Sequence, residues 1–346
     1  MKRLLWGLAT VAVLTLSLGV GEAPQVAGEA AGFILPADSN PSWGLSAVRA
    51  PEAWEITTGS ERIVVAVIDS GIDRTIPALA DRMWTNPAES ANSGRDDDGN
   101  GYADDLHGWD FRDGNADSLE GSRLNWHGTF VAGLIAASFD TESGAGGVAP
   151  EICIMDLRFL DSRGLFFSSD WPKLARAIDY AVDNGAHIIN LSMYAKMEPP
   201  PLVRQALQRA AREGVFIVGI AGNDGERVGY FGRYPEVFTV SAVDEDGRPA
   251  PFSNWGPEVD LTAPGVNVLS SYPGGSVRTG SGTSFAAPYV TGTAALMLSL
   301  NPEYTLSELR SALQSTAAGV EQGTSNEYIG AGLVDTAAAA RSAAGR

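Results

Sequence analysis

The chain has 346 residues, of which 44% are hydrophobic and 19% charged. This composition is typical of a globular protein with a large core and excludes a disordered or fibrous chain. With 24 Lys and Arg against 42 Asp and Glu, the formal net charge is −18. Such an acidic surface repels nucleic-acid phosphate and anionic membranes, so neither is an expected partner, whereas it is compatible with divalent cations.

The first twenty residues have the pattern of a secretory signal peptide. Lys2 and Arg3 precede an apolar run over residues 4–20, and small residues such as Gly21 and Ala23 follow it. The alternative is a transmembrane anchor, for which the run is only marginally long enough. We therefore expect a signal peptide at 1–20, a short pro- or linker segment at 21–40, and one domain at 41–346. The mature protein is expected to be a monomer outside the cell or in the periplasm, without a membrane contact.

The chain contains a single cysteine, Cys153, which lies in an apolar run. This context predicts a small buried side chain rather than a reactive thiol. A secreted protein without disulfides needs another source of stability, which makes a structural metal site more plausible.

Patterned sequence begins after the loose segment and alternates between strands and helices. Apolar, β-branched runs predict buried strands at residues 63–68, 153–157, 187–191, 215–220 and 237–243. Helical patterns lie between and after them, at 130–138, 170–184, 202–213 and from 284 to about 300. This alternation predicts an α/β fold with three layers, in which a mostly parallel central sheet is flanked by helices. Functional groups are then expected at the carboxyl ends of the strands.

The first candidates are an aspartate and a histidine. Asp69 follows the first predicted strand, where it can orient a histidine, although a turn aspartate gives the same pattern. His127 lies directly before the small-residue helix at 130–138, which holds the imidazole at a fixed depth, as a general base requires. The other two histidines are weaker candidates, since His107 lies in an acidic loop and His187 opens an apolar strand.

A serine and an asparagine complete the set. Ser284 follows Gly280 and Gly282 and begins an apolar helix, so it is either a nucleophile or a helix N-cap. The backbone N–H groups of such a helix terminus stabilise a developing oxyanion. Asn223 follows the strand at 215–220, and its amide is a second oxyanion donor unless it only supports a turn.

Together these motifs resemble the subtilisin-like serine proteases, or subtilases. The matching segments are Asp69-Ser-Gly-Ile-Asp, His127-Gly-Thr, Ala221-Gly-Asn223 and Gly282-Thr-Ser284-Phe-Ala-Ala-Pro, in the order found in that family. The resemblance extends from about Trp43 to the end of the chain. It implies a serine endopeptidase acting on proteins or peptides, in which Ser284 is the nucleophile and His127 the general base. Asp69 then orients His127, and Asn223 helps to bind the oxyanion.

An acidic loop gives a second signal. Asp96, Asp98 and Asn100 alternate, and Gly101 follows them, as at the start of an EF-hand calcium loop. The Tyr102 carbonyl is the next expected ligand. The twelfth position holds His107 instead of glutamate, so Asp105 is expected to close a shortened loop. We therefore expect a structural Ca²⁺ here; the alternative is a solvated acidic turn.

The resemblance also implies a substrate cleft with unusual residues. Its walls are expected to contain the following residues: Gly164, Leu165, Phe166, Ser192, Met193, Tyr194, Ala221, Gly222 and Gly229. Subtilases usually have small residues, often a glycine pair, where Met193 and Tyr194 stand. The aromatic side chains therefore either form an apolar subsite or partly obstruct one.

Two further functions stay open from the sequence. The chain is either an active endopeptidase, a calcium-stabilised binding protein that has lost catalysis, or a processing protease with a narrow set of substrates. The complete set of catalytic residue types argues against a binding protein, whereas the bulky cleft residues favour narrow specificity.

Overall fold

The computed structural model describes residues 25–26, 42–118, 126–320 and 324–345. The predicted signal peptide and most of the predicted pro- or linker segment lie outside these residues. Among the described residues, no helix combines the length and the hydrophobicity that crossing a bilayer requires.

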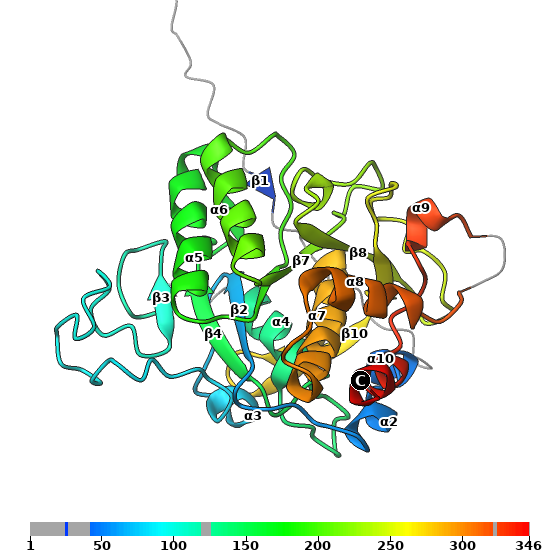
Figure 1. Ribbon diagram of the computed structural model, residues 1–346, viewed down its shortest axis with the longest axis horizontal. Coiled ribbons are helices and arrows are strands. Elements are labelled where there is room, and N and C mark those ends of the chain that lie inside the picture. Colours follow the sequence, from blue (N-terminus) through cyan, green and yellow to red (C-terminus); the bar gives the residue numbers. More distant parts are fainter. Residues whose placement is uncertain (1–24, 27–41, 119–125, 321–323, 346) are drawn as a thin grey trace, which may run out of the picture.

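A parallel sheet forms the centre of the molecule (Figure 1). Within the described ranges it has seven strands, in the order β3-β4-β2-β6-β7-β8-β9, and all adjacent pairs are parallel. The strands are β2 (Val64–Asp69), β3 (Gly108–Asp110), β4 (Cys153–Arg158), β6 (Ile188–Leu191), β7 (Phe216–Ile220), β8 (Val237–Val243) and β9 (Leu261–Pro264). The predicted α/β class is confirmed, and the five predicted strands agree to within one residue at either end. The two edge strands β3 and β9 were not predicted, since each is too short to show a pattern.

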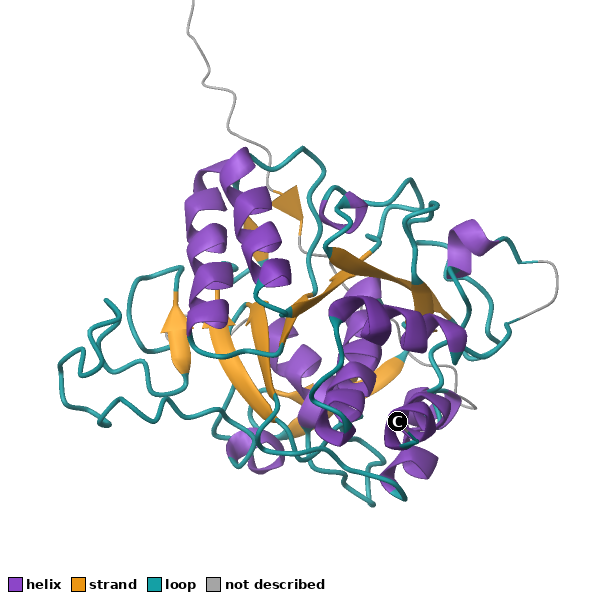
Figure 2. Cartoon of the chain, viewed as in Figure 1, coloured by secondary structure: helices purple, strands orange, loops and turns teal. Residues whose placement is uncertain are grey.

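Helices cover both faces of the sheet, which gives three layers (Figure 2). The helices are α1 (Trp43–Ala47), α2 (Ala50–Trp54), α3 (Pro77–Ala80), α4 (His127–Ala136), α5 (Trp171–Asp183), α6 (Pro201–Arg212), α7 (Thr283–Leu300), α8 (Leu306–Ser315), α9 (Asn326–Ile329) and α10 (Thr336–Ala344). Strand β2 shows how the layers share the core. Val65 and Val67 pack in the cluster that includes α4 and α7, while Ala66 and Ile68 pack with α5 and α6. A strand that is buried on both faces needs apolar residues at every position, which explains its continuous apolar run.

Two small antiparallel sheets lie outside the central one. In the first, β10 (Val268–Tyr272) pairs with β11 (Ser276–Gly280). In the second, β1 (Gln25–Val26) pairs with β5 (Leu165–Phe166). Strand β1 belongs to the segment at 21–40, and it pairs with two of the expected cleft residues, Leu165 and Phe166.

Cys153 is half-buried at the start of β4 and packs against the core beneath α5 and α6. The side chain is therefore less enclosed than the predicted buried one, because the first residue of this strand lies near the end of the sheet. Burial still raises the pKa of its thiol, which keeps it protonated and unreactive at neutral pH.

Candidate active site

Asp69 and His127 meet at the carboxyl end of β2. Asp69 is the last residue of this strand and His127 the first residue of α4. The His127 Nδ1 lies 2.8 Å from Asp69 Oδ1 and 3.0 Å from Oδ2. Both side chains are buried, with 1% of Asp69 and 6% of His127 exposed. The predicted helix at 130–138 thus begins three residues earlier, so that His127 lies within its first turn.

A glycine at the start of α4 allows this contact. A Cβ on Gly128 would lie 2.4 Å from the backbone oxygen of Gly71, a distance that no side chain tolerates. The start of α4 can therefore approach the loop after β2 only because residue 128 is glycine. Two hydrogen bonds fix the approach, from Gly128 N to Ser70 Oγ at 3.0 Å and from Ser70 N to Asp69 Oδ1 at 2.7 Å.

Ser284 lies in the first turn of α7, which starts at Thr283 rather than at Ser284 as predicted. Its Oγ donates to the backbone oxygen of Ser192 at 3.1 Å, and Ser192 Oγ donates to the Ser284 carbonyl at 2.8 Å. The ring of the next residue, Phe285, lies 5.4 Å from the His127 ring between centroids. The N-terminus of α7 is therefore held against both the end of β6 and the histidine.

Asn223 contacts the same helix terminus. Its Oδ1 accepts hydrogen bonds from the Thr283 N and Oγ1, each at 2.8 Å. These two donors fix the orientation of the amide, because the oxygen has to face them. The Nδ2 on the other side is buried and has no hydrogen-bond partner in the described part of the chain. An unpaired buried donor costs about 1–3 kcal/mol, so this one requires an explanation.

A buried carboxylate that is not among the predicted site residues supports the loop after Asp69. Asp156, in β4, accepts hydrogen bonds at Oδ2 from Ile72 N at 3.2 Å and from Ser118 Oγ. It is completely enclosed, and burial raises its pKa to about 6. The sequence signal was an ionisable residue within an apolar strand, which marks a side chain with a specific partner.

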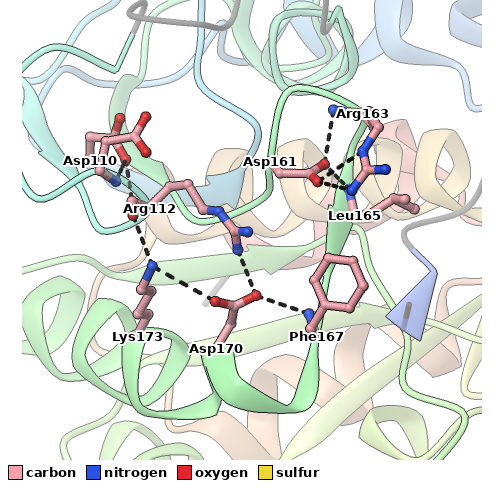
Figure 3. Close-up of polar contacts among 9 residues, drawn as sticks. Asp110, Arg112, Asp161, Arg163, Leu165, Phe167, Asp170 and Lys173 are labelled. Carbon is pink, nitrogen blue, oxygen red and sulfur yellow. Dashed lines mark hydrogen bonds and ion pairs between the residues drawn. The ribbon is translucent and has the colours of Figure 1, made fainter. Parts of the chain in front are cut away.

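Strand β5, at the expected cleft edge, is held at both ends by carboxylates (Figure 3). Asp161 Oδ1 accepts from Leu165 N at 2.9 Å, and Asp170 Oδ2 accepts from Phe167 N at 2.9 Å. Arg112 pairs with Asp170 at 2.6 Å and fixes that carboxylate in turn. The strand is thus rigid before anything binds to it, while its outer edge pairs with β1.

The other predicted cleft residues gather beyond β6 and β7. Gly229 donates to the backbone oxygen of Ala221 at 2.8 Å, which brings its loop beside Gly222. Tyr194 lies against both glycines and is buried, as is the preceding Met193. Gly164 forms the turn into β5 with a φ of +74°, a conformation that favours glycine. The nine predicted cleft residues therefore divide into the β5 edge and a group around the ends of β6 and β7.

The acidic loop brings several carboxylates together. Oxygen atoms of Glu89, Asp96 and Asp98 lie within 4.8 Å of one another. Asp96 accepts from three backbone N–H groups, of which that of Gly101 contributes most to lowering its pKa. Glu89 was not predicted, because it lies well before the alternating segment. It accepts from the N–H groups of Asp97 and Asp98 at 2.8 and 3.3 Å.

The remaining predicted ligands are Asn100, Tyr102 and Asp105, and hydrogen bonds and ring packing hold them in this loop. Asn100 Nδ2 donates to Asp98 at 3.0 Å and to Asp105 at 2.9 Å. Asp105 is fully buried and also accepts from Tyr180 Oη at 2.5 Å. The Tyr102 ring packs edge-on against Tyr180, with 5.0 Å between centroids. His107 points elsewhere, since its Nδ1 lies 2.7 Å from the Trp84 backbone oxygen.

A parallel sheet that brings a serine, a histidine and an aspartate to one edge is the architecture of a class of serine peptidases. Comparison with known proteins identifies the family. The model of the subtilase family matches residues 60–332. The chain is 35% identical over 302 residues to Subtilisin Savinase of Lederbergia lenta, covering 86% of this chain and 98% of that protein. It is also 35% identical over 302 residues to the M-protease of Shouchella clausii (strain KSM-K16), covering 86% and 70%.

A solved structure shares the fold. The Prenylagaramide maturation protease PagA superposes with a TM-score of 0.68 at 27% identity, covering 86% of this chain and 99% of that one. The chain therefore belongs to the subtilase family of serine peptidases.

Proposed function

We propose that this protein is a secreted serine endopeptidase that forms an acyl-enzyme on Ser284 and is stabilised by calcium. The observation that carries the proposal is the buried Asn223 Nδ2, which is fixed in orientation at the N-terminus of α7 and lacks a partner among the described residues. A protein that only binds gains nothing from a costly unpaired donor at this point, whereas an oxyanion that forms during catalysis would satisfy it.

The reaction follows from the positions of these groups. Ser284 Oγ, which now donates to the Ser192 carbonyl, turns about its Cα–Cβ bond toward the His127 Nε2. His127 takes the hydroxyl proton as the oxygen bonds to the substrate carbonyl carbon. Asp69 accepts the Nδ1 hydrogen, which fixes the tautomer and stabilises the resulting imidazolium.

The tetrahedral intermediate is then stabilised and resolved. Its oxyanion accepts hydrogen bonds from Asn223 Nδ2 and from the Ser284 N–H in the first turn of α7. When the C–N bond breaks, His127 returns the proton to the departing amine. Water, deprotonated by His127, then attacks the acyl-enzyme, and the proton goes back to Ser284 as the carboxylic acid leaves.

Substrate is proposed to bind as an extended strand. Strand β5 is held rigid by Asp161 and Asp170, and a β-strand added to its outer edge gains backbone hydrogen bonds. The pairing of β1 with this edge supports such binding. It also supports the assignment of residues 21–40 as a pro-segment that covers part of the cleft until maturation.

Calcium is proposed at the acidic loop because the donor set suits a hard cation. Its ligands would be Asp96, Asp98, Asn100, the Tyr102 carbonyl and Asp105, joined by Glu89, and all of them offer oxygen. A bound Ca²⁺ ion would offset the electrostatic repulsion among these carboxylates. The ion is proposed as structural only.

A narrow-specificity processing protease is a second candidate. The buried Tyr194 beside Gly222 favours it, because this side chain occupies space that most subtilases leave to small residues. PagA, which resembles this chain, is described as a maturation protease.

Fluorophosphonate labelling together with a peptide library separates these functions. Labelling at Ser284 and cleavage of many peptides supports a general endopeptidase, whereas labelling with cleavage of one or two supports the processing protease. Folded, calcium-loaded protein that is not labelled and cleaves no peptide overturns the proposal in favour of a binding protein.

A further inference from the structure

Given the proposed function, on which this inference rests, the position of the attacked carbonyl locates one substrate side chain. The P1 residue of the substrate is the residue that carries this carbonyl, so its side chain branches from the Cα atom that is bonded to the reacting carbon. Ser284 contacts the segment after β6 through Ser192, and Thr283 contacts the segment after β7 through Asn223. With its oxygen toward Asn223, the carbonyl directs the P1 side chain into the space between these two segments.

Glycines line that space, and another side chain of the protein fills it. A Cβ on Gly222 would lie 3.1 Å from Tyr194 Cδ2. A Cβ on Gly229 would lie 3.0 Å from both the Cβ and the Cδ2 of Tyr194. The tyrosine is only 3% exposed. The room that the two glycines leave open is therefore taken by this ring.

The Tyr194 hydroxyl lies beside the loop that carries Asn223 and Asp224. Burial, together with the neighbouring Asp224 carboxylate, raises the pKa of this hydroxyl. Asp224 is itself fixed, since Lys196 Nζ pairs with its carboxylate at 2.7 Å and its N–H donates to Asn254 Oδ1 at 2.8 Å. The ring therefore packs against the same loop that positions the Asn223 side chain, through its contact with Gly222.

We propose that Tyr194 fills the P1 pocket and restricts cleavage to bonds that follow a small residue, namely glycine, alanine or serine. A larger P1 side chain enters only if the buried ring leaves its place against Gly222 and Gly229. A single methylene in a tight pocket already changes kcat/KM by about 10–200-fold. The preference for alanine over phenylalanine at P1 is therefore expected to exceed about 100-fold.

The experiment measures kcat/KM on matched peptides that differ only at P1, with glycine, alanine, leucine or phenylalanine. It compares the wild-type protein with Tyr194→Gly, which empties the pocket, and Tyr194→Phe, which keeps the ring and removes only the hydroxyl. Each protein is first titrated with a fluorophosphonate, so that rates refer to folded enzyme with a reactive Ser284.

Three outcomes are distinguishable. The proposal is supported if the wild type and Tyr194→Phe both prefer small P1 residues. It also requires that kcat/KM for the phenylalanine peptide rises by about 100-fold in Tyr194→Gly. Efficient cleavage after phenylalanine by labelled wild-type protein overturns it, while the proposed function stands. Absence of both labelling and cleavage overturns the proposed function, and the inference with it.

Discussion

Replacing the buried Asp156 by asparagine should remove a pH dependence of stability that this one carboxyl group causes. Asp156 is fully enclosed beside the loop that follows Asp69, and its pKa is raised by burial from 3.8 to about 6. The folded protein therefore holds the proton more tightly than the unfolded chain. Its contribution to stability is fully present below pH 3.8 and is lost as the pH rises through about 6.

The size of the effect follows from the two pKa values. Each pKa unit corresponds to about 1.4 kcal/mol, so the free energy of unfolding falls by about 3 kcal/mol across this window. Asparagine does not ionise, and its oxygen can still accept from Ile72 N, which Asp156 Oδ2 does at 3.2 Å. The free energy of unfolding of Asp156→Asn, taken relative to that of the parent, should therefore rise by about 3 kcal/mol between pH 4 and pH 7.

Urea unfolding from pH 4 to pH 8 measures this difference. Both proteins carry Ser284→Ala, so that self-digestion does not interfere, and calcium is held constant. Asp246 has an exposed carboxylate at the surface, and Asp246→Asn is the matched control. It should change the free energy of unfolding by less than about 0.5 kcal/mol at each pH. A constant difference between Asp156→Asn and its parent over the whole range would show that the Asp156 carboxyl group does not cause the pH dependence, because a hydrogen-bond change alone is independent of pH.

Three further predictions concern the oxyanion donor, the close approach of α4 and the metal. In steady-state assays, Asn223→Ala should lower kcat by about 10²–10³-fold with little change in KM, and this decrease in kcat is the one known for the oxyanion asparagine of subtilisin itself. A decrease of only a few-fold contradicts the assignment of Asn223 as an oxyanion donor. Gly128→Ala should lower the free energy of unfolding in urea by about 1–3 kcal/mol, since its Cβ would lie 2.4 Å from a backbone oxygen. The control Gly319→Ala should change the free energy of unfolding little, because its Cβ would meet nothing within 4 Å. Removing calcium with a chelator should lower the free energy of unfolding of the parent by about 3 kcal/mol if calcium was present at 100 times its Kd. The same treatment should change the free energy of unfolding of Asp98→Asn much less, and equal losses in both proteins exclude this loop as the site.

The sequence predicted the central sheet because its strands are buried on both faces. The run from Val64 to Ile68 has apolar residues at every position, and only a strand between two layers of helices requires this. The edge strands β3 and β9 escaped prediction because three or four residues do not display a period. The helix starts at His127 and Thr283 were placed late, because the polar residues of a first turn resemble the loop before it.

The candidate site was predictable where its residues follow strands, and less so where distant segments meet. Asp69 and Asn223 both follow apolar runs, so their positions at one edge of the sheet could be inferred. Asp156 and Glu89 could not be assigned to their roles, because the partners that define them lie in other loops. The ring of Tyr194 lies between two glycines 28 and 35 residues further along the chain, and only the folded structure shows that contact.

Mapping the site of fluorophosphonate labelling shows whether Ser284 is a nucleophile that His127 and Asp69 activate. The folded protein is treated with the reagent in calcium, digested with a second protease, and its peptides are sequenced by mass spectrometry. We expect one modified residue, Ser284, with labelling abolished in Ser284→Ala and slowed by orders of magnitude in His127→Ala. Labelling at another residue, or labelling at an unchanged rate in His127→Ala, would contradict it.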